Sequence, residues 1–207
     1  MRGILLEMSP LRSLGVVFVA VLHAGCAATG GVPSEAFGDP IAERLVVAPY
    51  PAQTLWKEVT DRHTRDGSLL EWVPADQERN GARDVLAQQT FFRPRDVSAL
   101  ELARDLAKRI ALDCEVARTD GPRPGTEDGN DVAYAEVTCS RGSGSTRDAQ
   151  YLLKVIRGHE ALYLAQREFG YEPSAAQLRQ ANAFLADQVA LCPLAGGIGR
   201  CARRVAR

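Results

Sequence analysis

Residues 150–169, QYLLKVIRGHEALYLAQREF, decide the fold, because two runs of strand-forming residues lie on either side of a short turn. The runs are Gln150–Arg157 and Ala161–Phe169, and Gly158, His159 and Glu160 separate them. Runs rich in branched and aromatic residues, joined by a few residues that include glycine, are typical of a β-hairpin. The sequence therefore predicts an antiparallel pair of strands here.

A second pair of strands is predicted upstream, at Cys114–Arg118 and Val132–Ser140. Side chains in the second run alternate between two faces of a strand. One face carries Ala133, Ala135, Val137 and Cys139, and the other carries Tyr134, Glu136 and Thr138. Residues 119–131, rich in Gly, Pro and Asp, are expected to form the connection.

Two helices are predicted, each from a capping box. Ser98 and Glu101 begin the first, which runs to Asp113. Its apolar face consists of Leu102, Leu106 and Ile110, supported by Ala99, Ala103 and Ala107. Ser174 and Gln177 begin the second, after Pro173, with Leu178, Ala181, Leu185 and Val189 on its apolar face and Phe184 beside it.

Three more strands are expected, at Arg44–Tyr50, Ser68–Val73 and Asp84–Phe92. Short connections between neighbouring strands favour an antiparallel sheet. We predict a single α+β domain over residues 44–207, with an antiparallel sheet of about five to six strands. Both helices are expected on one face of that sheet, which makes a two-layer sandwich.

The amino-terminal region contains an apolar run of nine residues, Leu14–Leu22, followed by Ala24-Gly25-Cys26. Nine residues are too few to cross a bilayer as a helix, but they suit the core of a signal peptide. The pattern resembles a bacterial lipoprotein signal, although His23 stands where a branched apolar residue is usual. The resemblance implies that residues 1–25 are a signal peptide and that Cys26 is acylated, with a palmitate among its acyl chains.

On this interpretation residues 26–43 form a flexible tether between the lipid and the domain. Ala27 in place of aspartate implies the outer membrane, with the domain facing the periplasm. The alternatives are ordinary cleavage near Ala24 or Ala28, or a structural Cys26. A start at Met8 would remove Glu7 from the basic flank.

Four cysteines remain besides Cys26, which is an even number and favours two disulfides with three possible pairings. Two strands paired about a hairpin centre near residue 126 place Cys114 opposite Cys139. We therefore expect the disulfides Cys114–Cys139 and Cys192–Cys201. No Cys-x-x-Cys spacing occurs and the three histidines lie far apart, so no metal site is expected.

The charge balance argues against a nucleic-acid partner. Without residues 1–25 the chain has 23 basic and 25 acidic side chains, a net charge of −2. Nucleic-acid binding would demand a basic face. Four arginines near the end, at positions 200, 203, 204 and 207, could contact anionic lipid, lipopolysaccharide or an acidic partner, or form a solvated tail.

No motif points clearly to catalysis or to a cofactor. His159-Glu160 is interpreted as a polar turn, and His63 as a solvated loop residue. Residues 127–131, EDGND, lack the alternating acidic spacing of a calcium loop. Trp56 and Trp72 are candidate exposed aromatic residues, with a core position favoured for Trp72.

Three short phrases resemble small exported proteobacterial domains of unassigned function. They are Glu71–Pro74, Ala87–Gln89 and Ala161–Arg167, and the carboxy-terminal helix followed by a cysteine-bearing tail is also similar. The resemblance implies an exported address and this fold, and it transfers no catalytic residue.

We therefore expect a membrane-anchored periplasmic lipoprotein without enzymatic activity, which binds an envelope protein or supports an envelope assembly. The expected binding surface is the sheet face that the helices leave uncovered, with Tyr134, Glu136 and Thr138. The alternatives are a cell-envelope hydrolase and a periplasmic inhibitor or immunity-type protein. A hydrolase would need a clustered nucleophile, base and orienting group.

Overall fold

The structure is a computed structural model, and it describes residues 43–47, 55–92, 96–142 and 148–193. All of these residues belong to one compact unit, Pro40–Arg207. The predicted signal peptide, Cys26, nearly all of the tether, Cys201 and the four carboxy-terminal arginines lie outside the described residues. Within the described ranges, no helix is both long and apolar enough to cross a membrane.

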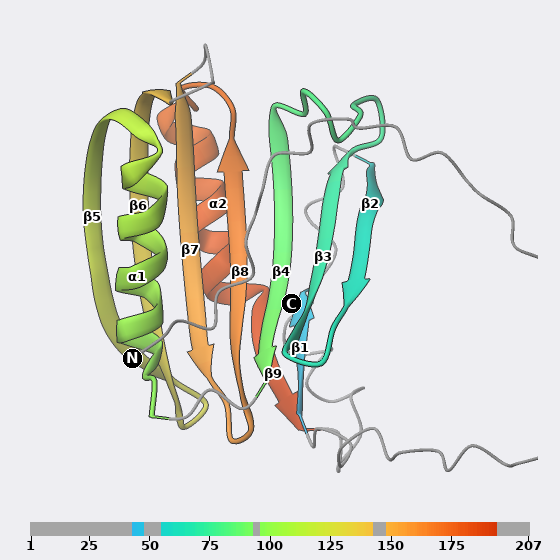
Figure 1. Cartoon of the computed structure of the whole chain (residues 1–207), viewed down its shortest axis with the longest axis vertical. Helices are drawn as coiled ribbons and strands as arrows, with labels where there is room; N and C mark the ends of the chain where they lie inside the picture. Colours follow the sequence, from blue (N-terminus) through green and yellow to red (C-terminus); the bar gives the residue numbers. More distant parts are fainter. Residues whose placement is uncertain (1–42, 48–54, 93–95, 143–147, 194–207) are drawn as a thin grey trace, which may run out of the picture. The chain divides into compact units, whose positions relative to one another are not determined.

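The main sheet has seven antiparallel strands in the order β2-β3-β4-β8-β7-β6-β5 (Figure 1). The strands are β2 Trp56–His63, β3 Gly67–Pro74, β4 Asp84–Phe92, β5 Cys114–Glu127, β6 Asn130–Gly142, β7 Ala149–Arg157 and β8 Ala161–Phe169. A separate ribbon pairs β1, Glu43–Val47, with β9, Val189–Pro193. The α+β class with an antiparallel sheet is confirmed, and β2 and β9 are strands that the sequence did not predict.

The hairpin of residues 150–169 is confirmed and occupies the middle of the sheet. Gln150 pairs with Phe169 at one end of β7 and β8, and Arg157 pairs with Leu162 at the other. Strand β6 pairs with β7, and β4 pairs with β8.

Both helices begin where the capping boxes predict. Helix α1 spans Ala99–Leu112, with Ser98 as its N-cap, and α2 spans Ala175–Asp187, with Ser174 as its N-cap. The expectation that Val189 continues the second helix is wrong. The helix ends at Asp187, and Val189 begins β9.

The two helices pack on opposite faces of the sheet, so the prediction that they share one face is wrong (Figure 1). Helix α1 packs on Leu153 and Val155, whereas α2 packs on Leu152 and Ile156. Neighbouring residues of a strand point to opposite faces. Because β7 and β8 carry apolar residues on consecutive positions, both of their faces require cover. The domain therefore has three layers, and the ribbon of β1 and β9 joins α2 in covering its face.

The segment 119–131 is not a loop, as was predicted, but continues both strands of the outer hairpin. The turn consists of Asp128 and Gly129, whose φ angles of 50° and 83° suit these residue types. The prolines of β5 are tolerated because β5 is an edge strand, with a register shift between Asp120 and Arg123.

The disulfide Cys114–Cys139 is confirmed, with Cα atoms 5.3 Å apart. The expected hairpin centre near residue 126 is wrong, because the turn lies at 128–129 and Cys139 is the register partner of Ala117. Cys192 is also disulfide-bonded. Its partner lies outside the described residues, so the pairing with Cys201 stays a prediction.

Candidate binding surface

The predicted surface residues Tyr134, Glu136 and Thr138 do share one face of β6, but this is the face that α2 covers in part. Tyr134 packs against the core cluster that contains α2. Glu136 is half-buried and Thr138 is exposed. The premise that this face is free of helices is therefore wrong, and the exposed part is the strip of β5 and β6 that lies toward the sheet edge.

Four residues make up this strip, which we call the outer polar face. Thr138 pairs with Arg118, and Glu136 pairs with Asp120, across the β5–β6 ladder. Strand β5 is exposed along nearly its whole length. The outer polar face therefore presents both signs of charge and a hydroxyl group to solvent.

A buried amide fixes two members of the outer polar face. Gln150 is 5% exposed, and its Nε2 donates to Glu136 Oε1 at 2.6 Å. Its Oε1 accepts a hydrogen bond from Thr138 Oγ1 at 3.0 Å. Because the amide both donates and accepts, the carboxylate and the hydroxyl are held side by side.

Tyr134 serves the interior instead of a binding surface. Its hydroxyl donates to Glu127 Oε1, and Lys154 Nζ lies 5.4 Å from the centre of its ring. Burial, together with the neighbouring Glu127 carboxylate, raises the pKa of Tyr134. The tyrosine is thus part of a polar group beneath the surface.

Lys154 is the centre of that group and is completely buried. Its Nζ lies 2.6 Å from Glu127 Oε2 and donates to the carbonyl oxygens of Leu185 and Val189 at 2.8 and 2.7 Å. A cation is favourable at the carboxyl end of a helix, here the last turn of α2. Burial lowers the pKa of Lys154, and Glu127 opposes that effect. The sequence analysis missed this role, although a lone lysine inside the run LLKVI demands a buried partner.

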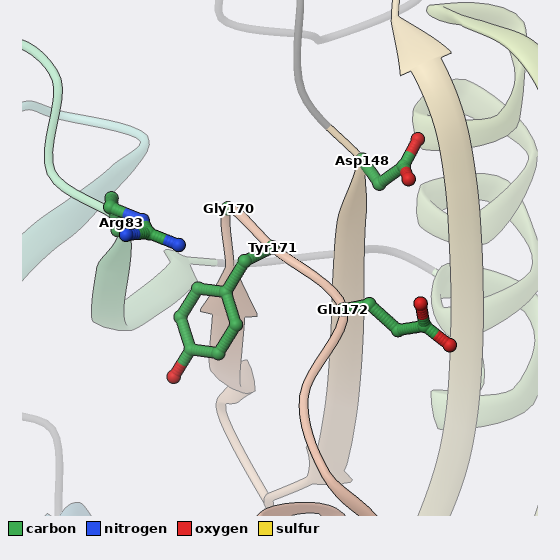
Figure 2. A pocket seen from close by; sticks show the side chains of 5 residues that line it. All are labelled: Arg83, Asp148, Gly170, Tyr171 and Glu172. Atoms are coloured by element: carbon green, nitrogen blue, oxygen red, sulfur yellow. The ribbon is translucent and has the colours of Figure 1, made fainter.

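A cleft of about 380 Å³ lies where β8 ends and β7 begins (Figure 2). Arg83, Asp148, Gly170, Tyr171 and Glu172 line it. Figure 2 shows Arg83 on one side of Tyr171, with the Asp148 and Glu172 carboxylates on the other. None of these residues was predicted, because they come together from three connections that are distant in sequence.

Several contacts fix the arginine side of the cleft. The guanidinium carbon of Arg83 lies 5.0 Å from the centre of the Tyr171 ring. The Gly170 N–H donates to the Arg83 carbonyl oxygen at 2.7 Å, and Gln177 Nε2 donates to the Tyr171 hydroxyl at 3.1 Å. Asp148 lies two residues before Gln150, so strand alternation continues the outer polar face into the cleft.

The opposite face of the sheet holds a different polar group, between β3 and the connection to β4. Arg79 makes two hydrogen bonds to the Glu71 carboxylate, at 3.0 and 2.8 Å, and Thr60 Oγ1 donates to it at 2.7 Å. Nearby, burial raises the pKa of Glu168, while Arg79 opposes the shift. This group ties residues 75–83 to the sheet.

The candidate catalytic residues of the sequence occupy two separate turns. His63 pairs with Asp61 at 2.8 Å, and both side chains are exposed. At the β7–β8 turn the backbone N–H groups of His159 and Glu160 donate to the Glu43 carboxylate. Over the described ranges, no group of three or more His, Cys, Asp or Glu side chains is arranged to hold a metal ion.

Trp56 is not an exposed aromatic anchor, which corrects that expectation. It lies in β2 and packs against the same core cluster as Trp72. Its ring centre is 4.6 Å from the guanidinium of Arg167, which is buried and forms an ion pair with Asp84.

Comparison with known proteins yields structural likeness only. No protein-family model matches the chain, and no curated protein matches it in sequence. The solution structure of cyanobacterial PsbP (CyanoP) from Synechocystis sp. PCC 6803 is similar with a TM-score of 0.44 and 12% identity, over 78% of this chain and 99% of that one. The crystal structure of LpqN, involved in cell envelope biogenesis of Mycobacterium tuberculosis, has a TM-score of 0.42 and 13% identity, over 76% and 88%.

Proposed function

We propose that the protein is an exported lipoprotein, held in the membrane by an acylated Cys26, whose folded domain binds a protein partner of the cell envelope. The short apolar run before Ala24-Gly25-Cys26 supports the anchor. The Cys114–Cys139 disulfide supports export, because disulfides persist in oxidising compartments such as the periplasm. Ala27 after the cysteine favours the outer membrane as the site of attachment.

The observation that carries the binding role is the continuity of the outer polar face with the cleft. Together they offer Arg118, Glu136 and Thr138, then the stacked pair of Arg83 and Tyr171. Buried Gln150 holds part of this surface in one geometry, which reduces the ordering cost of binding. Arginine and tyrosine are also enriched among the residues that dominate protein interfaces.

The anchor is tested by metabolic labelling with a palmitate analogue. The wild-type protein should be labelled, and the Cys26→Ser variant should not. An unlabelled wild-type protein with a mature terminus at Ala27 or later would contradict the anchor.

The binding role is tested by a photo-cross-linking amino acid placed at Thr138 or at Glu172 in cells. Both positions should capture the same envelope protein. The matched control is Lys108, an exposed position of α1 on the other face, which should capture none of it. Equal capture from Lys108, or no shared adduct from the two surface positions, would contradict the proposal.

A further inference from the structure

The two ends of the folded domain leave it at one place. Glu43 is the register partner of Pro193 in the ribbon of β1 and β9. The Glu43 carboxylate also accepts N–H bonds from His159 at 3.0 Å and Glu160 at 3.2 Å. The chain therefore enters and leaves the domain beside the β7–β8 turn, at what we call the ribbon end.

The cleft lies at the other end of the same strands. Asp148 precedes β7 and Gly170 follows β8, whereas the ribbon end lies beyond Arg157 and Ala161. Strand β7 has 9 residues. At about 3.3 Å per residue, the cleft stands roughly 30 Å from the ribbon end.

Chain length brings both ends within reach of one surface. Cys26 lies 17 positions before Glu43 in the sequence, so the tether spans about 60 Å at most. After Pro193 the first arginine is Arg200 and the last is Arg207. These positions are about 25 and 50 Å away along an extended chain.

Charge separates the tail from the folded ribbon end. Residues 194–207 contain four arginines and no acidic side chain. The turns at the ribbon end expose mainly acidic side chains, namely Asp66, Asp128, Asp131 and Glu160, with Arg65 beside them. An anionic bilayer would repel these turns but attract the tail.

We propose that residues 194–207 bind the anionic phospholipid surface of the membrane that holds Cys26, as a second, electrostatic attachment. This inference rests on the proposed lipid anchor. With both attachments at the ribbon end, the cleft and the outer polar face point away from the bilayer, where a partner reaches them. A lipid chain combined with a basic segment is a common requirement for stable membrane binding.

The test uses the mature chain with Cys26→Ser, so that binding does not depend on acylation. It should co-sediment with vesicles of phosphatidylglycerol and phosphatidylethanolamine, and much less with phosphatidylcholine vesicles. Replacing Arg200, Arg203, Arg204 and Arg207 by glutamine should weaken binding by about tenfold or more, as should high salt. The matched control replaces three exposed cations of α1, Arg104, Lys108 and Arg109, and should bind like the parent chain.

Three outcomes would overturn the inference. They are equal binding to both vesicle types, unchanged binding by the four-glutamine variant, and an equal loss in the α1 control. If the four-glutamine variant lost thermal stability without vesicles, the tail would be contacting its own domain instead of lipid. Failure of the lipid anchor is recognised separately, by the labelling of Cys26.

Discussion

The hairpin at the centre of the sheet and the hairpin at its edge have the same antiparallel construction but opposite surroundings. Strands β7 and β8 are buried on both faces, between α1 on one side and α2 on the other. Strand β5 is exposed along nearly its whole length, and a disulfide ties its start to β6. The comparison teaches that burial holds the centre, a covalent link holds the edge, and only the edge presents polar groups to a partner.

The largest expected effect is at Lys154, in the centre. The Lys154→Met variant keeps the volume of the side chain but leaves Glu127 as an unpaired, partly buried carboxylate. We expect the free energy of unfolding to fall by about 3–5 kcal/mol, measured by denaturant titration.

Two further variants separate charge from packing at this position. Adding Glu127→Gln to Lys154→Met should restore part of the loss, and Lys108→Met on the exposed side of α1 should cost less than about 0.5 kcal/mol. If Lys154→Met and Lys108→Met cost the same, the buried ion pair has no special role.

The edge should respond next, to loss of its covalent link. The disulfide closes the segment from Cys114 to Cys139, a sequence separation of 25. The loop-entropy relation gives about 3.5 kcal/mol for a loop of this size. Replacing both cysteines by serine should lower the free energy of unfolding by about that amount, and hydrogen exchange should increase in β5 more than in β7. Uniform exchange in the two strands would break the comparison.

A smaller effect is expected from the pH dependence of Glu168. Burial raises its pKa above the ordinary value of 4.5, so the folded state holds this proton more tightly than the unfolded state. Its stabilising contribution is present below pH 4.5 and is lost as the pH rises through the raised pKa. Glu168→Gln should flatten the decline of stability in that window, in denaturant titrations at several pH values. Glu172→Gln, at an exposed cleft position, serves as the control, and an equal change in both variants would contradict the assignment.

The smallest effect is expected at the β7–β8 turn. The His159 backbone N–H, not its imidazole, bonds to Glu43. The His159→Ala variant should therefore change the free energy of unfolding by less than about 0.5 kcal/mol and leave the cellular phenotype intact. Loss of the phenotype in a folded, abundant His159→Ala protein would favour a catalytic role for this turn.

The sequence predicts most elements of the fold because their signals are local. The capping boxes at Ser98 and Ser174 place the start of both helices, and the turn at Gly158 places the central hairpin. The faces of the helices were misplaced because the analysis generalised the alternation of Val132–Ser140 to the whole sheet. The consecutive apolar residues of β7 and β8, such as Leu152 and Leu153, already indicated strands covered on both faces.

The candidate site was less predictable, because its parts are joined only by the fold. The face shared by Glu136 and Thr138 follows from alternation. Arg83, Asp148 and Tyr171 come from separate connections, and no local pattern brings them together. Likewise, the burial of Lys154 depends on the end of α2, about 30 residues further along the chain.

The most direct test of the account measures stability and partner capture on one pair of variants, Leu153→Ala in the centre and Thr138→Asp at the edge. Leu153→Ala should lower the free energy of unfolding by about 2–5 kcal/mol and leave capture by a cross-linker at Glu172 unchanged per folded molecule. Thr138→Asp should change stability by less than about 0.5 kcal/mol and strongly reduce that capture. Undiminished capture by a folded Thr138→Asp protein would contradict the claim that the edge of the sheet is the binding surface.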